Sequence, residues 1–189
     1  ADSAAVLKGE LLSVAVTGAT LFIGTGATFD AGSGAVSLPA SSDANAVGFS
    51  VTGGAFNLGV FTAREASVNG TTYTALGTAQ APIRKYTGLA GSLGKAQLQG
   101  VDAVKILATN LSLTLTRTSV AEGNRLDWRQ STLANAGLTL TPTSPTLQIG
   151  GTVGLAIADV VFASATLDMS RSTAEGVDDP DDAGARVLQ

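Results

Sequence analysis

Apolar residues at every second position are the feature that most constrains the fold of this chain. The clearest runs are 12–16, 47–51, 56–60, 111–115, 147–149, 153–157 and 167–169. Because successive side chains of a strand point to opposite faces, this spacing is typical of β-strands. Helical spacing is not sustained anywhere, and only 63–67 and 130–136 have room for a turn or two of helix. The sequence therefore predicts an all-β fold.

Glycine- and proline-containing segments separate these runs. The main ones are 30–34, Gly53-Gly54, 88–94, 142–145 and Gly150-Gly151. Short strands with turn residues roughly every 8–12 positions are typical of sandwiches, barrels and solenoids. We therefore expect strands to end at these segments.

Two internal repeats favour a stack of like strands. Residues 16–24 match 51–59, and residues 113–119 match 167–173 with arginine in register with arginine. Chance similarity between alternating strands is the competing explanation. In a β-solenoid each turn buries its inward side chains against the turns above and below. We expect a β-solenoid or β-helix-like stack with irregular turns, in which each pair stacks in parallel. The alternative is a two-sheet β-sandwich with antiparallel neighbours.

The chain divides into three parts on this basis. Residues 1–10 are expected to form an N-terminal extension or a strand for contact between copies, 11–173 a single β-repeat domain, and 174–189 an acidic tail or linker. The first residues lack a methionine and the features of a signal peptide, as expected for a processed or excised piece. No apolar run reaches the roughly 18 residues of a membrane-spanning helix, so no transmembrane segment is expected.

The composition excludes much catalytic chemistry. The 189 residues include no histidine and no cysteine, which rules out a Ser-His-Asp triad, a thiolate nucleophile and disulfides. The net charge of −4 argues against a nucleic-acid partner, because phosphate backbones are bound by basic surfaces. We therefore predict that the protein is not an enzyme and binds no nucleic acid.

A run of acidic residues near the C-terminus is the one candidate metal site. It contains Asp178, Asp179, Asp181 and Asp182. Calcium favours clustered carboxylates, although the spacing does not match an EF-hand loop. Two interpretations remain open, a solvated acidic linker and a Ca²⁺ site between modules. No other cofactor is predicted.

Arg125-Leu126-Asp127-Trp128-Arg129 is the most charged and aromatic part of the chain, and Arg84-Lys85-Tyr86 is a smaller one. Tryptophan and arginine are enriched in protein interfaces, and tryptophan also stacks on cations. We predict Trp128, Arg125 and Tyr86 as interface residues. The alternatives for Trp128 are a platform on which a sugar stacks, or a structural position in which it caps an end of the core or covers a loop.

Several blocks together resemble a known group of proteins. They are 12–24, 48–60, Tyr73-Thr74-Ala75-Leu76, 108–113 and Leu126-Asp127-Trp128. Their order resembles repeat segments of giant bacterial surface proteins of the adhesin-like, RTX-associated kind, over residues 11–173. The resemblance implies a repetitive, extracellular structural module and supplies no catalytic residue. The glycine-rich calcium-binding nonapeptide that often accompanies such segments is missing here.

These observations predict a non-catalytic module of the extracellular space or bacterial cell surface. Its expected partners are copies of itself, joined head to tail into a filament, sheath or surface layer, or it forms one repeat of a giant adhesin. One alternative is a carbohydrate- or surface-binding module, which requires an exposed row of aromatic side chains. Another is a polysaccharide-active β-helix enzyme, which requires paired carboxylates beside a basic residue in a groove.

Overall fold

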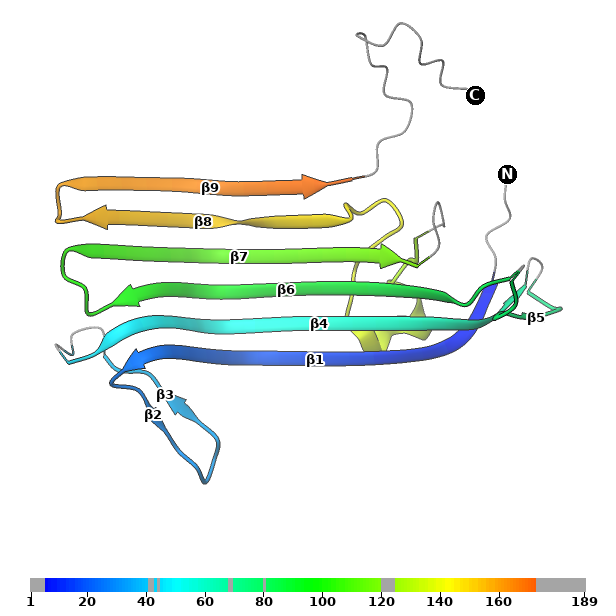
Figure 1. Cartoon of the computed structure of the whole chain (residues 1–189), viewed down its shortest axis with the longest axis horizontal. Coiled ribbons are helices and arrows are strands. Elements are labelled where there is room, and N and C mark those ends of the chain that lie inside the picture. Colours follow the sequence, from blue (N-terminus) through cyan, green and yellow to red (C-terminus); the bar gives the residue numbers. More distant parts are fainter. Residues whose placement is uncertain are drawn as a thin grey trace, which may run out of the picture.

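The computed structural model describes residues 6–40, 43, 45–67, 70–79, 81–119 and 125–172, and six long strands dominate them (Figure 1). The strands are β1 (Val6–Thr25), β4 (Val47–Ser67), β6 (Arg84–Gln99), β7 (Val104–Thr118), β8 (Leu147–Ile157) and β9 (Val161–Arg171). They lie side by side in the order β1-β4-β6-β7-β8-β9, and every neighbouring pair is antiparallel. The prediction of an all-β fold is confirmed.

Three short strands and one helix complete the described structure. β5 (Thr74–Ala75) pairs with the end of β4, while β2 (Thr28–Phe29) and β3 (Val36–Ser37) form a separate hairpin at the other end of the sheet (Figure 1). The 3₁₀ helix η1 (Ser131–Ala136) lies where a turn of helix was expected. The second expected helical stretch, 63–67, is wrong, because it lies in β4 and pairs with β1.

The first repeat pair does not stack in parallel as predicted. Residues 16–24 lie in β1 and 51–59 in β4, and these strands are antiparallel neighbours, with Val16 opposite Phe56. β7 and β9, which carry most of the second pair, run in the same direction but have β8 between them. Parallel neighbours need long crossover connections, whereas consecutive strands pair readily as antiparallel neighbours.

The described strands form one meandering sheet and no closed coil. The predicted β-solenoid is therefore not confirmed. The antiparallel neighbours expected of the sandwich are present, but the second sheet consists only of the β2–β3 hairpin. Residues 6–10, expected in an extension, form the first part of β1.

Three of the segments that were expected to end strands instead lie inside them, namely Gly53-Gly54, 88–94 and Gly150-Gly151. Gly53 has a left-handed φ of 66° within β4, and Gly18 has a φ of 67° at the corresponding level of β1. Asn110 repeats this conformation in β7, with a φ of 54°. Such irregularities interrupt the register of a strand without ending it, as they do between β1 and β4 and between β7 and β8. The ladder therefore continues through Gly53-Gly54 and through Gly150-Gly151, and β4 reaches 21 residues.

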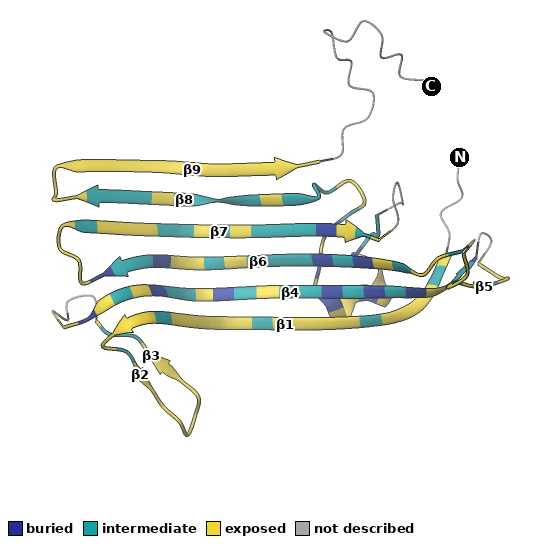
Figure 2. Cartoon of the chain, viewed as in Figure 1, coloured by how far each residue is buried: buried dark blue, intermediate teal, exposed yellow. Residues whose placement is uncertain are grey.

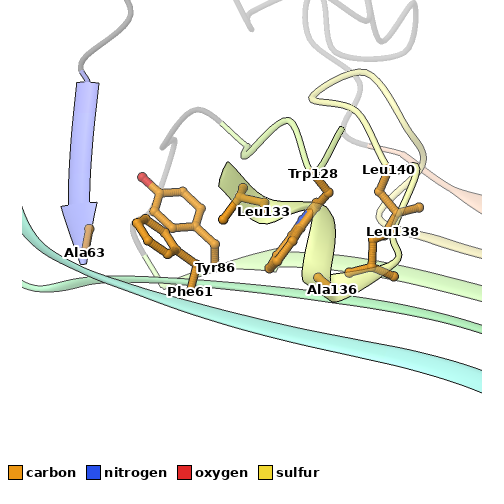
Figure 3. Close-up of a cluster of buried hydrophobic side chains, with 8 residues drawn as sticks. All are labelled: Phe61, Ala63, Tyr86, Trp128, Leu133, Ala136, Leu138 and Leu140. Atoms are coloured by element: carbon orange, nitrogen blue, oxygen red, sulfur yellow. The ribbon is translucent and has the colours of Figure 1, made fainter. Parts of the chain in front are cut away.

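The main hydrophobic core lies at one end of the sheet and on one face (Figure 2). It forms where residues 126–141, which include η1, fold over β4 and β6 (Figure 3). Its buried members are Phe61, Ala63, Tyr86, Trp128, Leu133, Ala136, Leu138 and Leu140. The rest of the sheet is a single layer, in which large apolar side chains stay exposed or half-buried.

Candidate functional site

Trp128 fixes the 126–141 segment to the sheet. It lies over Gly59 of β4 and Gly88 of β6, which are directly opposite each other. A Cβ atom at Gly59 would be 2.5 Å from the indole Cζ3, and one at Gly88 would be 2.8 Å from Cε2. Trp128 is 1% exposed, and its backbone N–H donates to the carbonyl oxygen of Leu140 at 2.9 Å. Only glycine leaves room for the ring at these two positions.

The other two predicted interface residues lie around the same segment. Tyr86 is buried beside Phe61, with 6.3 Å between the ring centroids, and the Arg125 guanidinium donates to the carbonyl oxygen of Ser144. The structure thus brings Trp128 and Tyr86 into one core cluster (Figure 3). Both rings are buried in the single chain, and their role as interface residues stays a prediction.

Asp127 faces solvent beside the buried tryptophan. Arg129 donates to it from Nε at 3.0 Å, from Nη2 at 2.8 Å and from its backbone N–H at 3.0 Å. These hydrogen bonds, the side-chain ones first, lower the pKa of Asp127 to about 2. A general acid needs a raised pKa, so this carboxyl group is suited to holding a charge at the surface and not to proton transfer.

The candidate calcium ligands Asp178, Asp179, Asp181 and Asp182 lie outside the described residues. Within the described ranges, no three acidic residues are grouped to hold a metal ion. None of the described helices is long and apolar enough to cross a membrane. For the acidic run, the solvated linker and the Ca²⁺ site therefore both stay predictions from the sequence.

The edge strand β9 is the most unusual surface of the sheet. All 11 of its residues are exposed (Figure 2), including Phe162 at 71%, Leu167 at 49% and Met169 at 45%. Natural edge strands are usually short, or carry lysine, proline or bulges that prevent pairing with another chain. β9 has neither lysine nor proline, its only charges are Asp168 and Arg171, and it keeps an unbroken register with β8. Its outer backbone groups are therefore open to a further strand.

The opposite edge, β1, carries few charges, but its register with β4 shifts between Lys8 and Gly9 and again between Val16 and Leu21. Its charges are confined to Lys8 and Glu10 near the start, and Glu10 pairs with Arg64 of β4 at 3.3 Å. No charged residue follows until Asp30. Leu12 is 60% exposed. The sheet thus ends in two long edges, and in β1 the stretch from Gly9 to Val16 is the longest without a register shift.

The face opposite the 126–141 segment is also apolar. Gly59 and Phe61 lie under the segment, so the alternating Leu58 and Val60 point to the other face, and strand pairing extends this face across the sheet. We call it the open face. Its members are Leu12, Val14, Val16, Phe56, Leu58, Val60, Leu89, Leu93, Leu111, Leu113, Leu115, Leu147, Ile149, Leu167 and Met169. All of them are exposed or half-buried.

No family model matches the chain, and no curated protein or solved structure is significantly similar to it. The candidate site must therefore be judged on geometry. Sequence patterns located the strands, but not which two would lie at the edges. The one available signal was that 161–171 is an apolar strand with few charges, which is unusual for an edge.

Proposed function

We propose that this protein is a non-catalytic structural module that assembles head to tail, by adding β9 of one copy to β1 of the next. The observation that carries the proposal is the pair of free edges on opposite sides of one sheet, of which β9 keeps an unbroken register and β1 carries no charge after Glu10. In this arrangement the strands of each copy extend the sheet of the copy before it. A solenoid would instead grow by stacking coils.

Strand direction supports this contact. Six strands alternate in direction across the sheet, so β9 is antiparallel to β1. A second copy moved along the sheet without rotation therefore places its β1 antiparallel to β9 of the first. The alternation continues across the junction without a break. A contact between two different edges cannot close on itself unless the copies rotate into a ring, so it produces an open filament.

Register supplies specific neighbours at the junction. One row on the face covered by the 126–141 segment crosses the whole sheet through Ala15, Asn57, Ala90, Thr114, Gln148 and Ser170. If rows continue directly, Ser170 of one copy lies opposite Ala15 of the next, with about 5 Å between their Cβ atoms. The same contact can join separate chains in a filament, sheath or surface layer, or consecutive repeats of a larger adhesin at the cell surface.

The absence of native cysteine allows a direct test by cross-linking. Ala15→Cys and Ser170→Cys chains are mixed and treated with a short bismaleimide. We expect dimers that contain one copy of each variant, and few when either variant is treated alone. The matched control replaces Ser170→Cys with Ser164→Cys, which lies six residues away on β9, and it should cross-link poorly.

Electron microscopy of the unmodified protein gives the second readout. We expect filaments with a repeat of about 29 Å, which is six strands at about 4.8 Å each. Monodisperse single chains at all concentrations, together with no cross-link between positions 15 and 170, would overturn the proposal. Comparing calcium with a chelator tests the acidic run, because a Ca²⁺ site at the junction predicts filament loss only with the chelator.

A further inference from the structure

We propose that the open face is covered by the open face of a second copy, related to the first by a two-fold axis that runs across the strands. This deepens the proposed function, on which it rests for the direction of filament growth. It turns a single-layer filament into a two-layer one, with the 126–141 segments on the outside of both layers.

The size of the open face fits such a contact. Its outline spans the six long strands and four rows of side chains, from the row of Leu12 to the row of Leu111. The two central rows cross all six strands, whereas the row of Leu12 and Val60 ends at Arg117 of β7. At about 4.8 Å per strand and 6.8 Å per row, the outline measures about 27 Å by 29 Å, or roughly 800 Å². A stable protein interface buries about 800 Å² on each partner.

The chemistry of the face also fits a second sheet. Its two central rows consist of leucine, valine, isoleucine, phenylalanine and methionine, apart from Gly91 in the middle and Arg171 at the β9 end. Contiguous exposed apolar patches of more than a few hundred Å² mark interaction sites. Aliphatic side chains that stand at regular intervals on a flat sheet interdigitate with the same pattern on a facing sheet about 10 Å away.

Basic residues at one end of the face select the orientation. Lys85 and Arg117 point to the open face at the end where β6 begins and β7 finishes. Arg117 lies in the row of Leu12 and Val60, and Lys85 lies one row further out, in the same row as Glu10 of β1. In the described residues, neither forms an ion pair with an acidic side chain. A two-fold axis parallel to the strands would bring the two basic ends within about 10 Å of each other. That distance is close to the screening length at physiological salt, so the ends would repel.

An axis that runs across the strands places these ends far apart. It moves each basic end over the opposite end of the partner face, so that the two copies of Arg117 lie about 20 Å apart along the strands. This axis also keeps the β1-to-β9 direction the same in both layers. Both layers then extend in the same direction, as a filament built by edge addition requires.

Leu113→Asp tests the contact, because it places a carboxylate near the middle of the face. Its matched control is Ser112→Asp, one residue earlier on the opposite face, where Ser112 is exposed. The readout is mass per length by scanning transmission electron microscopy. For the wild type and Ser112→Asp we expect two chains in each filament repeat of about 29 Å. For Leu113→Asp we expect one chain in each repeat. Two layers in Leu113→Asp, or one layer in the wild type, would overturn the inference.

Cross-linking keeps the test independent of whether Leu113→Asp folds. A mixture of Leu113→Cys and Leu115→Cys should cross-link across the layers, because the axis places position 113 over position 115. Lys85→Cys alone should not, and efficient Lys85→Cys dimers would overturn the proposed orientation. Dimers in solution without filaments would support the contact between open faces and overturn edge addition. Single-layer filaments would support edge addition and overturn the contact between open faces.

Discussion

Two regions of the sheet are built very differently, one around β4 and β6 and the other around β8 and β9. β4 and β6 lie beneath the 126–141 segment and contribute Phe61, Ala63 and Tyr86 to a closed hydrophobic core. β8 has no buried residue, and β9 is exposed throughout (Figure 2). Both regions carry the same alternation of apolar and small residues, so pattern alone does not decide which strands become covered.

The difference teaches where the stability of the single chain comes from. A β-sheet needs something packed on at least one face to be stable in water. In a single chain, only the part of the sheet under the 126–141 segment has such packing on one face. The pair of β8 and β9 is joined to the rest of the sheet only through β7, and it has little apolar burial. We infer that the first region holds the chain folded, while the second is completed by contact with other copies.

Two phenylalanines, one in each region, give the largest contrast. Phe61→Ala removes a ring that is 8% exposed and should lower the free energy of unfolding by about 3–5 kcal/mol. Phe162→Ala removes a ring that is 71% exposed, and should change it by less than about 1 kcal/mol in the single chain. Urea unfolding followed by circular dichroism, at concentrations below assembly, measures both.

The same two substitutions distinguish residues needed for folding from residues needed for assembly. Phe162 lies on the edge strand, so Phe162→Ala is expected to weaken filament formation while leaving the single chain folded. Equal destabilisation by the two substitutions would show that β9 is part of the folding unit. The division into a self-sufficient region and a region completed by other copies would then be wrong.

Strand content could be predicted from the sequence because period-two alternation is a local property. The runs at 12–16, 111–115 and 167–169 lie in β1, β7 and β9. The runs at 47–51 and 56–60 were expected to be separate strands, but both lie in β4. Glycine pairs were interpreted as strand ends because the sequence shows their conformational freedom. The sequence does not show that the neighbouring strand continues its pairing past such a position.

The glycines of the covered region give a second, smaller contrast. Gly88→Ala places a methyl group where Trp128 and Leu138 already lie, with its closest approach at 2.7 Å. Overpacking of this kind costs about 1–3 kcal/mol. Gly91→Ala, three residues later on the same strand and on the open face, meets only ordinary contacts at 3.6 Å and should be tolerated.

Trp128 is the only tryptophan, so its fluorescence reports on this position directly. We expect a red shift of emission in Gly88→Ala, because the indole moves toward water, and none in Gly91→Ala. An unshifted spectrum with unchanged stability would mean that the ring does not depend on the bare backbone at Gly88.

The candidate site was harder to predict than the strands, since it depends on long-range order. The sequence marked Trp128 and Tyr86 as unusual, but nothing local indicated that Gly59 and Gly88 would lie opposite each other beneath the indole. Leu138 and Leu140 alternate like a strand, yet they lie in an irregular part of the covering segment and are both buried. Which faces and edges stay open follows from strand order, and strand order is set by the whole chain.

The smallest effect expected concerns the exposed ion pair on the covering segment. Hydrogen bonds from Arg129 lower the pKa of Asp127 from 3.8 to about 2 in the folded chain. A lowered folded-state pKa contributes stability above the unfolded value, and this contribution is lost as the pH falls from about 4 through 2. The group is open to solvent, so the effect on overall stability should be slight. The direct measurement is a carboxyl NMR titration, which should give a midpoint near 2 for Asp127.

Arg129→Gln isolates the cause of this shift. It removes the charged donor, so the midpoint for Asp127 should rise toward the ordinary aspartate value of 3.8. Arg125→Gln is the matched control, because Arg125 donates to the carbonyl of Ser144 and not to Asp127, and it should leave the midpoint in place. A midpoint that moves equally in both variants would mean that the whole segment had shifted on the sheet. In that case the titration of Asp127 would report how firmly Trp128 holds the covered region.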